Sequence, residues 1–149
     1  MFISERDLGK DYRMKHNYNI CPIRAVENEI DISCSYVFLT RRDDIDVQPN
    51  VLLLDVLDTE EERHPYRFTN ENARKILELI ENSSIEDVFV CCDQGESRSA
   101  GVAAALIELE GGDSSYIWKS SEYHPNRLFY KTMKEVLQTY KEMKFDWGK

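Results

Sequence analysis

The chain has 149 residues, with 28 acidic and 19 basic side chains and a net charge of −9 at neutral pH. This length suits a single domain, residues 1–149, and a hydrophobic content of 42% supports a packed core and excludes wholesale disorder. The acidic balance argues against nucleic acids and membranes as partners, because their anionic surfaces select an excess of Lys and Arg. The acidic excess is concentrated in residues 51–100, where twelve acids face five bases.

The cysteines and the apolar runs predict the compartment. Four cysteines, two of them adjacent, lack the spacing of a secreted disulfide framework. There is no Cys-x-x-Cys pair and no pair of His at ligand spacing, so we expect no metal and no cofactor. The N-terminal residues lack the apolar core of a signal peptide, and no apolar run reaches transmembrane length. These features predict a cytoplasmic protein.

The first half of the chain predicts strands and then a helix. Short apolar runs predict strands near residues 1–4, 19–24 and 36–39, and a longer run predicts a buried strand over 51–57. After an acidic loop, Thr69 has the position of a helix N-cap. The apolar residues that follow it at helical spacing are Ala73, Ile76, Leu77 and Ile80.

The second half continues the alternation. Residues 87–92 predict a second clear strand, and residues 98–110 predict a buried helix of small residues that ends at Gly111-Gly112. A last amphipathic helix begins near residues 125–126. This order predicts an α/β fold, a three-layer sandwich in which helices flank a mostly parallel central sheet.

The most informative stretch is the loop between the strand ending at Cys92 and the helix beginning at Arg98. Such a turn directs successive backbone N–H groups, and the positive end of the helix dipole, toward one small concavity. Gly95 occupies the middle of this loop, where a positive φ or a closely approaching anion excludes a side chain. The residues expected to bind a phosphate are Asp93, Gln94, Gly95, Glu96, Ser97 and Arg98.

Three side chains of this stretch predict phosphoryl chemistry. The loop amides, the helix dipole and Arg98 all favour the thiolate form of Cys92, the nucleophilic form of cysteine. Arg98 offers a planar fork for two oxygens of a tetrahedral dianion. A thiolate beneath a bound phosphate is placed for in-line attack on phosphorus, which forms a cysteinyl-phosphate intermediate. The Ser99 hydroxyl is available to stabilise the sulfur when it leaves.

The motif Cys-x5-Arg-Ser, at a strand–loop–helix junction, resembles the signature loop of the cysteine-dependent protein tyrosine phosphatases. Residues 95–101, Gly-Glu-Ser-Arg-Ser-Ala-Gly, are similar to the dual-specificity-like branch. The match extends over about residues 50–140 to the short predicted tyrosine phosphatases of bacteria and phages, and includes residues 52–58 and 123–127. The resemblance implies that Cys92 is the nucleophile and Arg98 the phosphate ligand, and that residues 124–126 support the loop.

Two features of the loop depart from the family pattern. Cys91 stands where the family usually has His before the nucleophile. We expect it to be a small buried strand residue whose side chain points away from that of Cys92; the alternative is a redox partner for oxidised Cys92, a role also open to Cys21 or Cys34. Asp93 and Glu96 add negative charge to the loop, with side chains free to point outward while their amides point inward.

The resemblance also implies a general acid, an Asp on a separate loop that protonates the leaving group. Asp58 begins the acidic loop, whereas Asp55 is expected inside the strand, so we favour Asp58 and keep Asp55 as the alternative. Carboxylates crowd beside it, and like charges favour a protonated acid. These neighbours, Glu60, Glu61 and Glu62, are further candidates.

Together these features predict a metal-independent phosphatase that hydrolyses phosphotyrosine, and also phosphoserine or phosphothreonine if its pocket is shallow. The expected catalytic residues are Cys92, Arg98, Asp58 and Ser99. The expected partner is a phosphorylated protein or peptide with basic flanking residues, or a small aryl phosphate, because the acidic segment repels polyanions. The alternatives are a phosphate-binding module without turnover and a thiol-based transferase or reductase.

Overall fold

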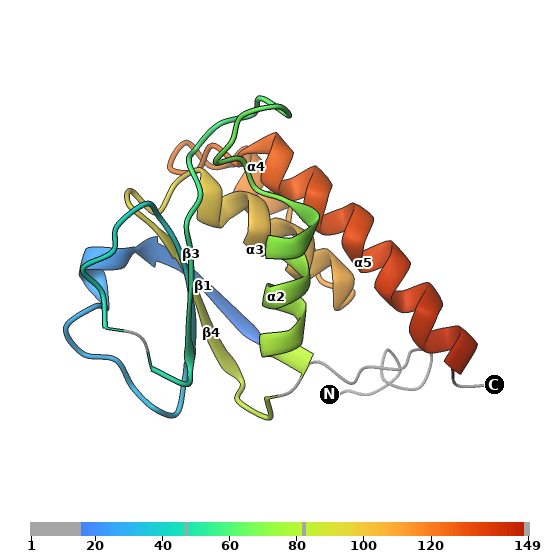
Figure 1. Ribbon diagram of the computed structural model, residues 1–149, viewed down its shortest axis with the longest axis horizontal. Coiled ribbons are helices and arrows are strands. Elements are labelled where there is room, and N and C mark those ends of the chain that lie inside the picture. The colour runs from blue at the N-terminus through green and yellow to red at the C-terminus, as the bar shows by residue number, and fades with distance from the viewer. Residues whose placement is uncertain (1–15, 47, 82, 148–149) are drawn as a thin grey trace.

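The computed structural model describes residues 16–46, 48–81 and 83–147 (Figure 1). The strand expected near residues 1–4 lies outside the described residues. Four strands form one sheet in which every pair of neighbours is parallel. These strands are β1 (Asn17–Pro22), β2 (Ser35–Leu39), β3 (Val51–Leu54) and β4 (Asp87–Cys92).

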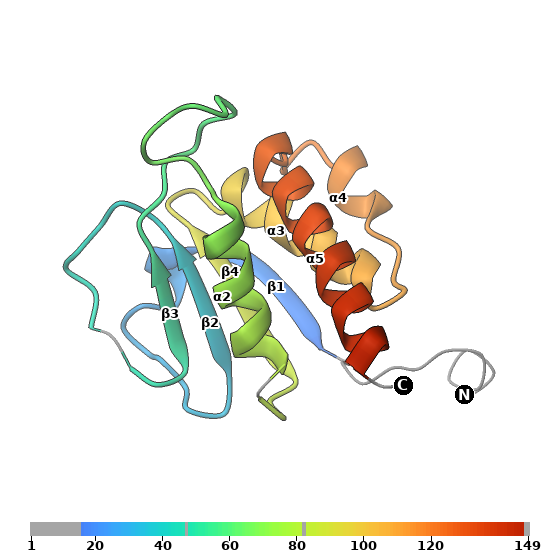
Figure 2. The same ribbon diagram turned by 45° about the vertical axis from the view of Figure 1, so that its right-hand side comes forward.

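The spatial order of the strands is β1-β4-β2-β3. β4 therefore lies between β1 and β2, with Cys91 opposite Cys21 on one side and Phe38 on the other. Because the sheet is parallel, the carboxyl ends of the strands meet at one edge. The loop after Cys92 opens at this edge, with the segments that follow β1 and β2 on either side (Figures 1 and 2).

Two expected strands end earlier than predicted. β1 ends at Pro22, and a 3-10 helix, η1 (Ile23–Ala25), occupies the residues that we expected to continue the strand to residue 24. β3 ends at Leu54, because β2, the strand beside it, ends at Leu39. The Thr40 N–H, one residue beyond β2, still donates to the Leu54 carbonyl. Asp55 consequently lies just outside the strand and not inside it as predicted.

The helices confirm the local signals in the sequence. They are α2 (Asn70–Glu81), α3 (Arg98–Leu109), α4 (Ser115–Lys119) and α5 (Arg127–Trp147). Thr69 caps α2, since its Oγ1 accepts the Asn72 N–H at 3.2 Å while Asn72 Oδ1 accepts the Thr69 N–H at 2.9 Å. Gly111, with φ at +83°, follows the end of α3. The short α4 has no counterpart in the prediction, and Ile117 is its buried residue.

Helices α2 and α3 pack against the sheet, and α5 packs against both of them (Figures 1 and 2). The small residues of α3 allow close contact, and Ala100, Ala103 and Ala104 are fully buried. Gly101 faces α5 so closely that a Cβ there would lie 2.5 Å from the Asn126 carbonyl oxygen. No helix in the described ranges is both long and apolar enough to cross a bilayer.

The opposite face of the sheet carries a second, smaller hydrophobic cluster. Cys91 belongs to it together with Cys34 and Phe38, whereas Cys92 belongs to the main core on the helix side. The two adjacent cysteines therefore point to opposite faces, as the alternation of a strand predicts.

Candidate active site

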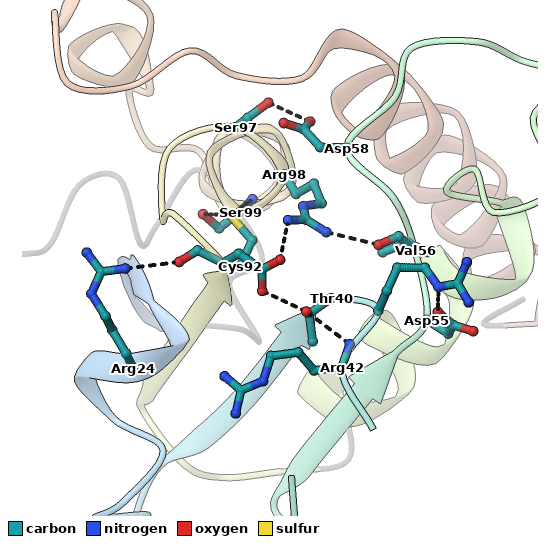
Figure 3. Close-up of polar contacts among 12 residues, drawn as sticks. Arg24, Thr40, Arg42, Asp55, Val56, Asp58, Cys92, Ser97, Arg98 and Ser99 are labelled. Atoms are coloured by element: carbon teal, nitrogen blue, oxygen red, sulfur yellow. Dashed lines mark hydrogen bonds and ion pairs between the residues drawn. The ribbon is translucent and has the colours of Figure 1, made fainter. Parts of the chain in front are cut away.

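Cys92 lies at the carboxyl end of the central strand, beneath the loop that leads into α3. Its side chain is buried, and its Sγ lies 3.2 Å from Ser99 Oγ (Figure 3). The Ser99 backbone N–H also donates to this sulfur, at 3.5 Å. Ser99 is thus the residue that contacts the sulfur from the first turn of the helix.

The loop between Cys92 and Arg98 presents unpaired backbone donors. Within the described part of the chain, the N–H groups of Gln94, Gly95, Glu96 and Ser97 donate to no backbone or side-chain acceptor. Ser97 precedes α3 as its N-cap residue without a side-chain capping bond. Consecutive free N–H groups at a helix N-terminus form a site suited to an anion.

Gly95 is required by the packing of this loop against β1. Its φ is +70°, and a Cβ at this position would lie 2.5 Å from both the Cys21 carbonyl carbon and the Pro22 nitrogen. A side chain is therefore excluded on two counts, by conformation and by the neighbouring backbone. The positive φ expected for Gly95 is present, and the backbone that approaches Gly95 closely is that of β1.

Arg98 is buried, with 8% of its surface exposed, and is held by two hydrogen bonds. Its Nη1 donates to the Val56 carbonyl and its Nη2 to Asp93 Oδ2, each at 3.0 Å. Its Nε is buried and has no hydrogen-bond partner. Among residues 16–46, 48–81 and 83–140, it is the only buried side-chain nitrogen or oxygen that lacks one. An unsatisfied buried donor costs about 1–3 kcal/mol, and more on a charged group, so an anion oxygen at Nε would relieve that cost.

The Asp93 side chain corrects one expectation. It does not point outward but turns toward Arg98, and its other oxygen accepts the Thr40 hydroxyl at 2.7 Å. Arg24 Nη1 donates to the Asp93 carbonyl at 3.3 Å. Asp93 therefore links the loop to the ends of β1 and β2 and offsets part of the charge on Arg98.

Asp58 and Asp55 occupy different surroundings. Asp58 Oδ1 accepts the Ser97 hydroxyl at 2.7 Å and the Asn126 side-chain amide at 2.8 Å, which places the carboxylate at the mouth of the loop. Asp55 instead pairs with Arg41 at 2.5 Å, on the side away from Ser97 (Figure 3). Of these two candidate acids, Asp58 is the one that contacts the loop.

The other acidic candidates contact the start of α5. Glu60 Oε2 accepts the Arg127 backbone N–H at 2.9 Å, and Glu62 pairs with Lys131 at 3.2 Å. Glu61 is exposed, and none of the three contacts the loop residues 93–98 through a hydrogen bond between described residues.

Two residues of the site were not predicted, Thr40 and Val56, whereas the contacts of residues 124–126 with the loop agree with the supporting role that the resemblance implied for them. Asn126 is buried, caps α5 through Oδ1 and donates from its backbone to the Ser97 carbonyl, while the His124 N–H donates to the Glu96 carbonyl. The position of Asn126 just before α5 fits its role as the cap of that helix. Thr40 and the Val56 carbonyl have no local signal, because they reach the site only through strand order.

The remaining cysteines do not face Cys92. Cys91 Sγ lies 3.5 Å from Cys21 Sγ, and Cys34 lies on the same face of the sheet as this pair. Cys21 and Cys34 are therefore not placed as thiol partners for Cys92, contrary to that alternative, because the sheet separates them from its sulfur.

Comparison with known proteins shows the fold. The sequence matches no protein-family model and no curated protein. The structure is similar to that of human DUSP28, with a TM-score of 0.58, 16% identity, and coverage of 85% of this chain and 94% of that one. It is also similar to PTPMT1 (TM-score 0.55, 17% identity, 91% and 98% covered) and to Cydia pomonella PTP-2 phosphatase (0.55, 17%, 83% and 88%). The chain thus has the fold of the cysteine-dependent, dual-specificity-like phosphatases.

Proposed function

We propose that the protein is a phosphatase that hydrolyses phosphotyrosine, alone or together with phosphoserine and phosphothreonine, through a cysteinyl-phosphate intermediate. The observation that carries the proposal is the set of unpaired donors around Cys92. Four backbone N–H groups and the buried Nε of Arg98 lack partners in the described residues, beside a buried sulfur at a helix N-terminus. A tetrahedral dianion satisfies these donors together.

In the first step, the Cys92 thiolate attacks phosphorus and the ester oxygen leaves. The loop amides and Arg98 stabilise the charge on the equatorial oxygens, so the proposed reaction does not require a metal ion to neutralise that charge. Asp58, held at the loop by Ser97 and Asn126, gives its proton to the leaving oxygen.

In the second step, water attacks phosphorus and the phosphorus–sulfur bond breaks. Asp58 accepts a proton from the water, and inorganic phosphate forms. The Ser99 hydroxyl, 3.2 Å from the sulfur, stabilises the thiolate as it leaves.

The charges around the loop suggest the substrate class. Glu96 is exposed in the loop, and the acidic segment after Asp58 lies beside it through the Asp58–Ser97 contact. These carboxylates favour a phosphorylated peptide with basic flanking residues, or a small aryl phosphate. PTPMT1 has been solved in complex with PI(5)P, so a lipid phosphate is the natural comparison substrate.

Hydrolysis of p-nitrophenyl phosphate with a chelator present tests the proposal. We expect turnover by the wild-type protein and none above background for Cys92→Ser. Cys34→Ser is the matched control, because Cys34 is buried on the opposite face of the sheet and we expect its loss to leave turnover intact. Wild-type turnover by Cys92→Ser would overturn the proposal. Phosphotyrosine peptides with basic or acidic flanks, and PI(5)P in micelles, then rank the substrates.

One observation favours a second candidate, a phosphate-binding module without turnover. Asp93 already pairs with Arg98 at 3.0 Å, so a carboxylate competes with phosphate for the guanidinium. This candidate predicts saturable binding of a phosphotyrosine peptide by the wild-type protein, measured by calorimetry, and no release of inorganic phosphate.

A further inference from the structure

Two cysteines outside the candidate active site face each other across neighbouring strands. Cys21 of β1 is in register with Cys91 of β4, and their sulfurs lie 3.5 Å apart. Neighbouring strands lie about 4.8 Å apart, within the range of about 4.4–6.8 Å that separates the Cα atoms of disulfide-bonded residues. The backbone therefore needs little rearrangement to bring these sulfurs into bonding distance.

The two thiols have unequal surroundings. Cys91 is fully buried, whereas Cys21 is partly exposed at the edge strand. The hydrogen bond from Cys91 lowers the pKa of Cys21, while that same contact and burial raise the pKa of Cys91. Cys21 is thus the thiol that an oxidant reaches, and Cys91 is the protected thiol beside it.

We propose that Cys21 and Cys91 are a redox site that forms a reversible disulfide when the protein meets a peroxide. This pairing is separate from Cys92, whose sulfur lies on the other face of the sheet with Ser99. The proposal does not depend on phosphatase activity, because it needs neither a substrate nor the nucleophile.

The chemistry balances in two steps. The Cys21 thiolate attacks hydrogen peroxide, the oxygen–oxygen bond breaks, and Cys21 sulfenic acid and hydroxide form. The Cys91 sulfur then attacks the Cys21 sulfur, the sulfur–oxygen bond breaks, and the Cys91 proton leaves with the hydroxyl group as water. A small thiol reverses the reaction by exchange.

The disulfide would join the two strands that hold the phosphate loop. Cys91 immediately precedes Cys92, and a Cβ on Gly95 would lie 2.5 Å from the Cys21 carbonyl carbon. The Cys21 backbone therefore lies against the loop at Gly95, and a Cys21–Cys91 bond does not use the sulfur of the candidate nucleophile.

Peptide mapping of the full chain in the Cys92→Ser variant tests the proposal, because this variant removes the other candidate reactive thiol. After one equivalent of hydrogen peroxide and alkylation, we expect a Cys21–Cys91 linked peptide, the loss of two alkylatable thiols, and their recovery after a small thiol is added. Cys92→Ser/Cys34→Ala is the matched control and should retain the link. Cys92→Ser/Cys21→Ala should lose it.

Three results would overturn the proposal. These are a link between Cys21 and Cys34, oxidation of Cys21 to the sulfinic acid while Cys91 stays alkylatable, and a link from Cys21 or Cys91 to Cys92 in the wild-type protein. Because peptide mapping measures the linked thiols and needs neither a substrate nor turnover, none of these results depends on whether the protein is a phosphatase.

Discussion

Asp93 Oδ2 lies 3.0 Å from Arg98 Nη2, so a carboxylate from the loop after β4 contacts the first residue of α3. Thr40 holds the other carboxylate oxygen at 2.7 Å, and the Val56 carbonyl holds Arg98 Nη1. The arrangement orients the guanidinium, but it also places a negative charge next to the expected position of a dianion. These two effects have opposite consequences for phosphate affinity.

Asp93→Asn separates these effects, because the amide oxygen still accepts a hydrogen bond from Arg98 but carries no charge. We expect the variant to bind inorganic phosphate about three- to tenfold more tightly, since removing one like charge a few ångströms away is worth about 1 kcal/mol in a partly solvated site. Competitive inhibition of aryl phosphate hydrolysis measures the affinity. Glu96→Gln, which removes an exposed charge from the same loop, is the control and should have a smaller effect. Weaker binding by Asp93→Asn would show that orientation by the charged form dominates.

Asp58→Asn tests the proposed general acid. We expect turnover of phenyl phosphate to fall about 10²- to 10⁴-fold, because its leaving group needs a proton, and p-nitrophenyl phosphate to be affected less. In the plot of turnover against pH, the decline at high pH should also disappear in this variant. Asp55→Asn is the matched control, because Asp55 pairs with Arg41 and does not contact the loop. Equal losses in both variants would argue against a proton donor at Asp58.

Ser99→Ala should slow the release of the cysteine sulfur from the intermediate. A hydrogen bond to a charged group is worth about 1.5–3 kcal/mol, so we expect intermediate breakdown to slow by about 10- to 100-fold. A burst of p-nitrophenol equal to the enzyme concentration would appear in rapid-mixing experiments. Ser97→Ala, which removes a hydroxyl bound to Asp58 and not to the sulfur, should produce no such burst.

The surroundings of Tyr18 predict how the stability of the protein depends on pH. Burial and the neighbouring Glu110 carboxylate, whose Oε2 accepts the Tyr18 hydroxyl at 2.7 Å, raise the pKa of Tyr18 above its usual value. A group whose pKa is raised on folding contributes fully to the free energy of unfolding below its unfolded pKa, about 10 for Tyr. That contribution is lost as the pH rises above this value.

We therefore expect the free energy of unfolding to fall more steeply above about pH 10 in the wild-type protein than in Tyr18→Phe. Urea unfolding between about pH 8 and 11 measures both slopes. Tyr66→Phe is the control and should keep the wild-type slope, because the Tyr66 side chain is exposed. Identical slopes for wild type and Tyr18→Phe would contradict the prediction.

Local signals in the sequence were sufficient for most elements. Thr69 caps α2 as predicted, the small residues of α3 are buried as predicted, and the positive φ of Gly95 is present. These features depend on neighbours within a few residues, so the sequence itself contains the relevant information. The predicted ends of β1 and β3 were wrong, because a strand ends where its partner ends, and the partner is remote in sequence.

The charge at the site also depended on tertiary structure. The acidic segment 51–100 contains the loop, yet Arg24 and Arg42 come to the same edge of the sheet from the first third of the chain (Figure 3), and Arg41 reaches Asp55 after β3. Arg41 and Arg42 are paired with carboxylates, whereas Arg24 donates to the Asp93 carbonyl. A charge count along the sequence therefore does not describe the field at the loop.

Local patterns in the chain were enough to identify the candidate nucleophile, the candidate phosphate ligand and the parallel α/β class. These patterns are the five residues between Cys92 and Arg98 and the alternation of strands and helices. The turn of Asp93 onto Arg98 and the position of Cys21 beside Cys91 needed the tertiary structure, which also brings Asp58, the acid favoured from the sequence, into contact with Ser97. For Asp93 and for the cysteine pair, the reason is the strand order β1-β4-β2-β3. Placing β4 between two strands distant in sequence brings their ends to the loop, and long-range packing, rather than local propensity, selects that order.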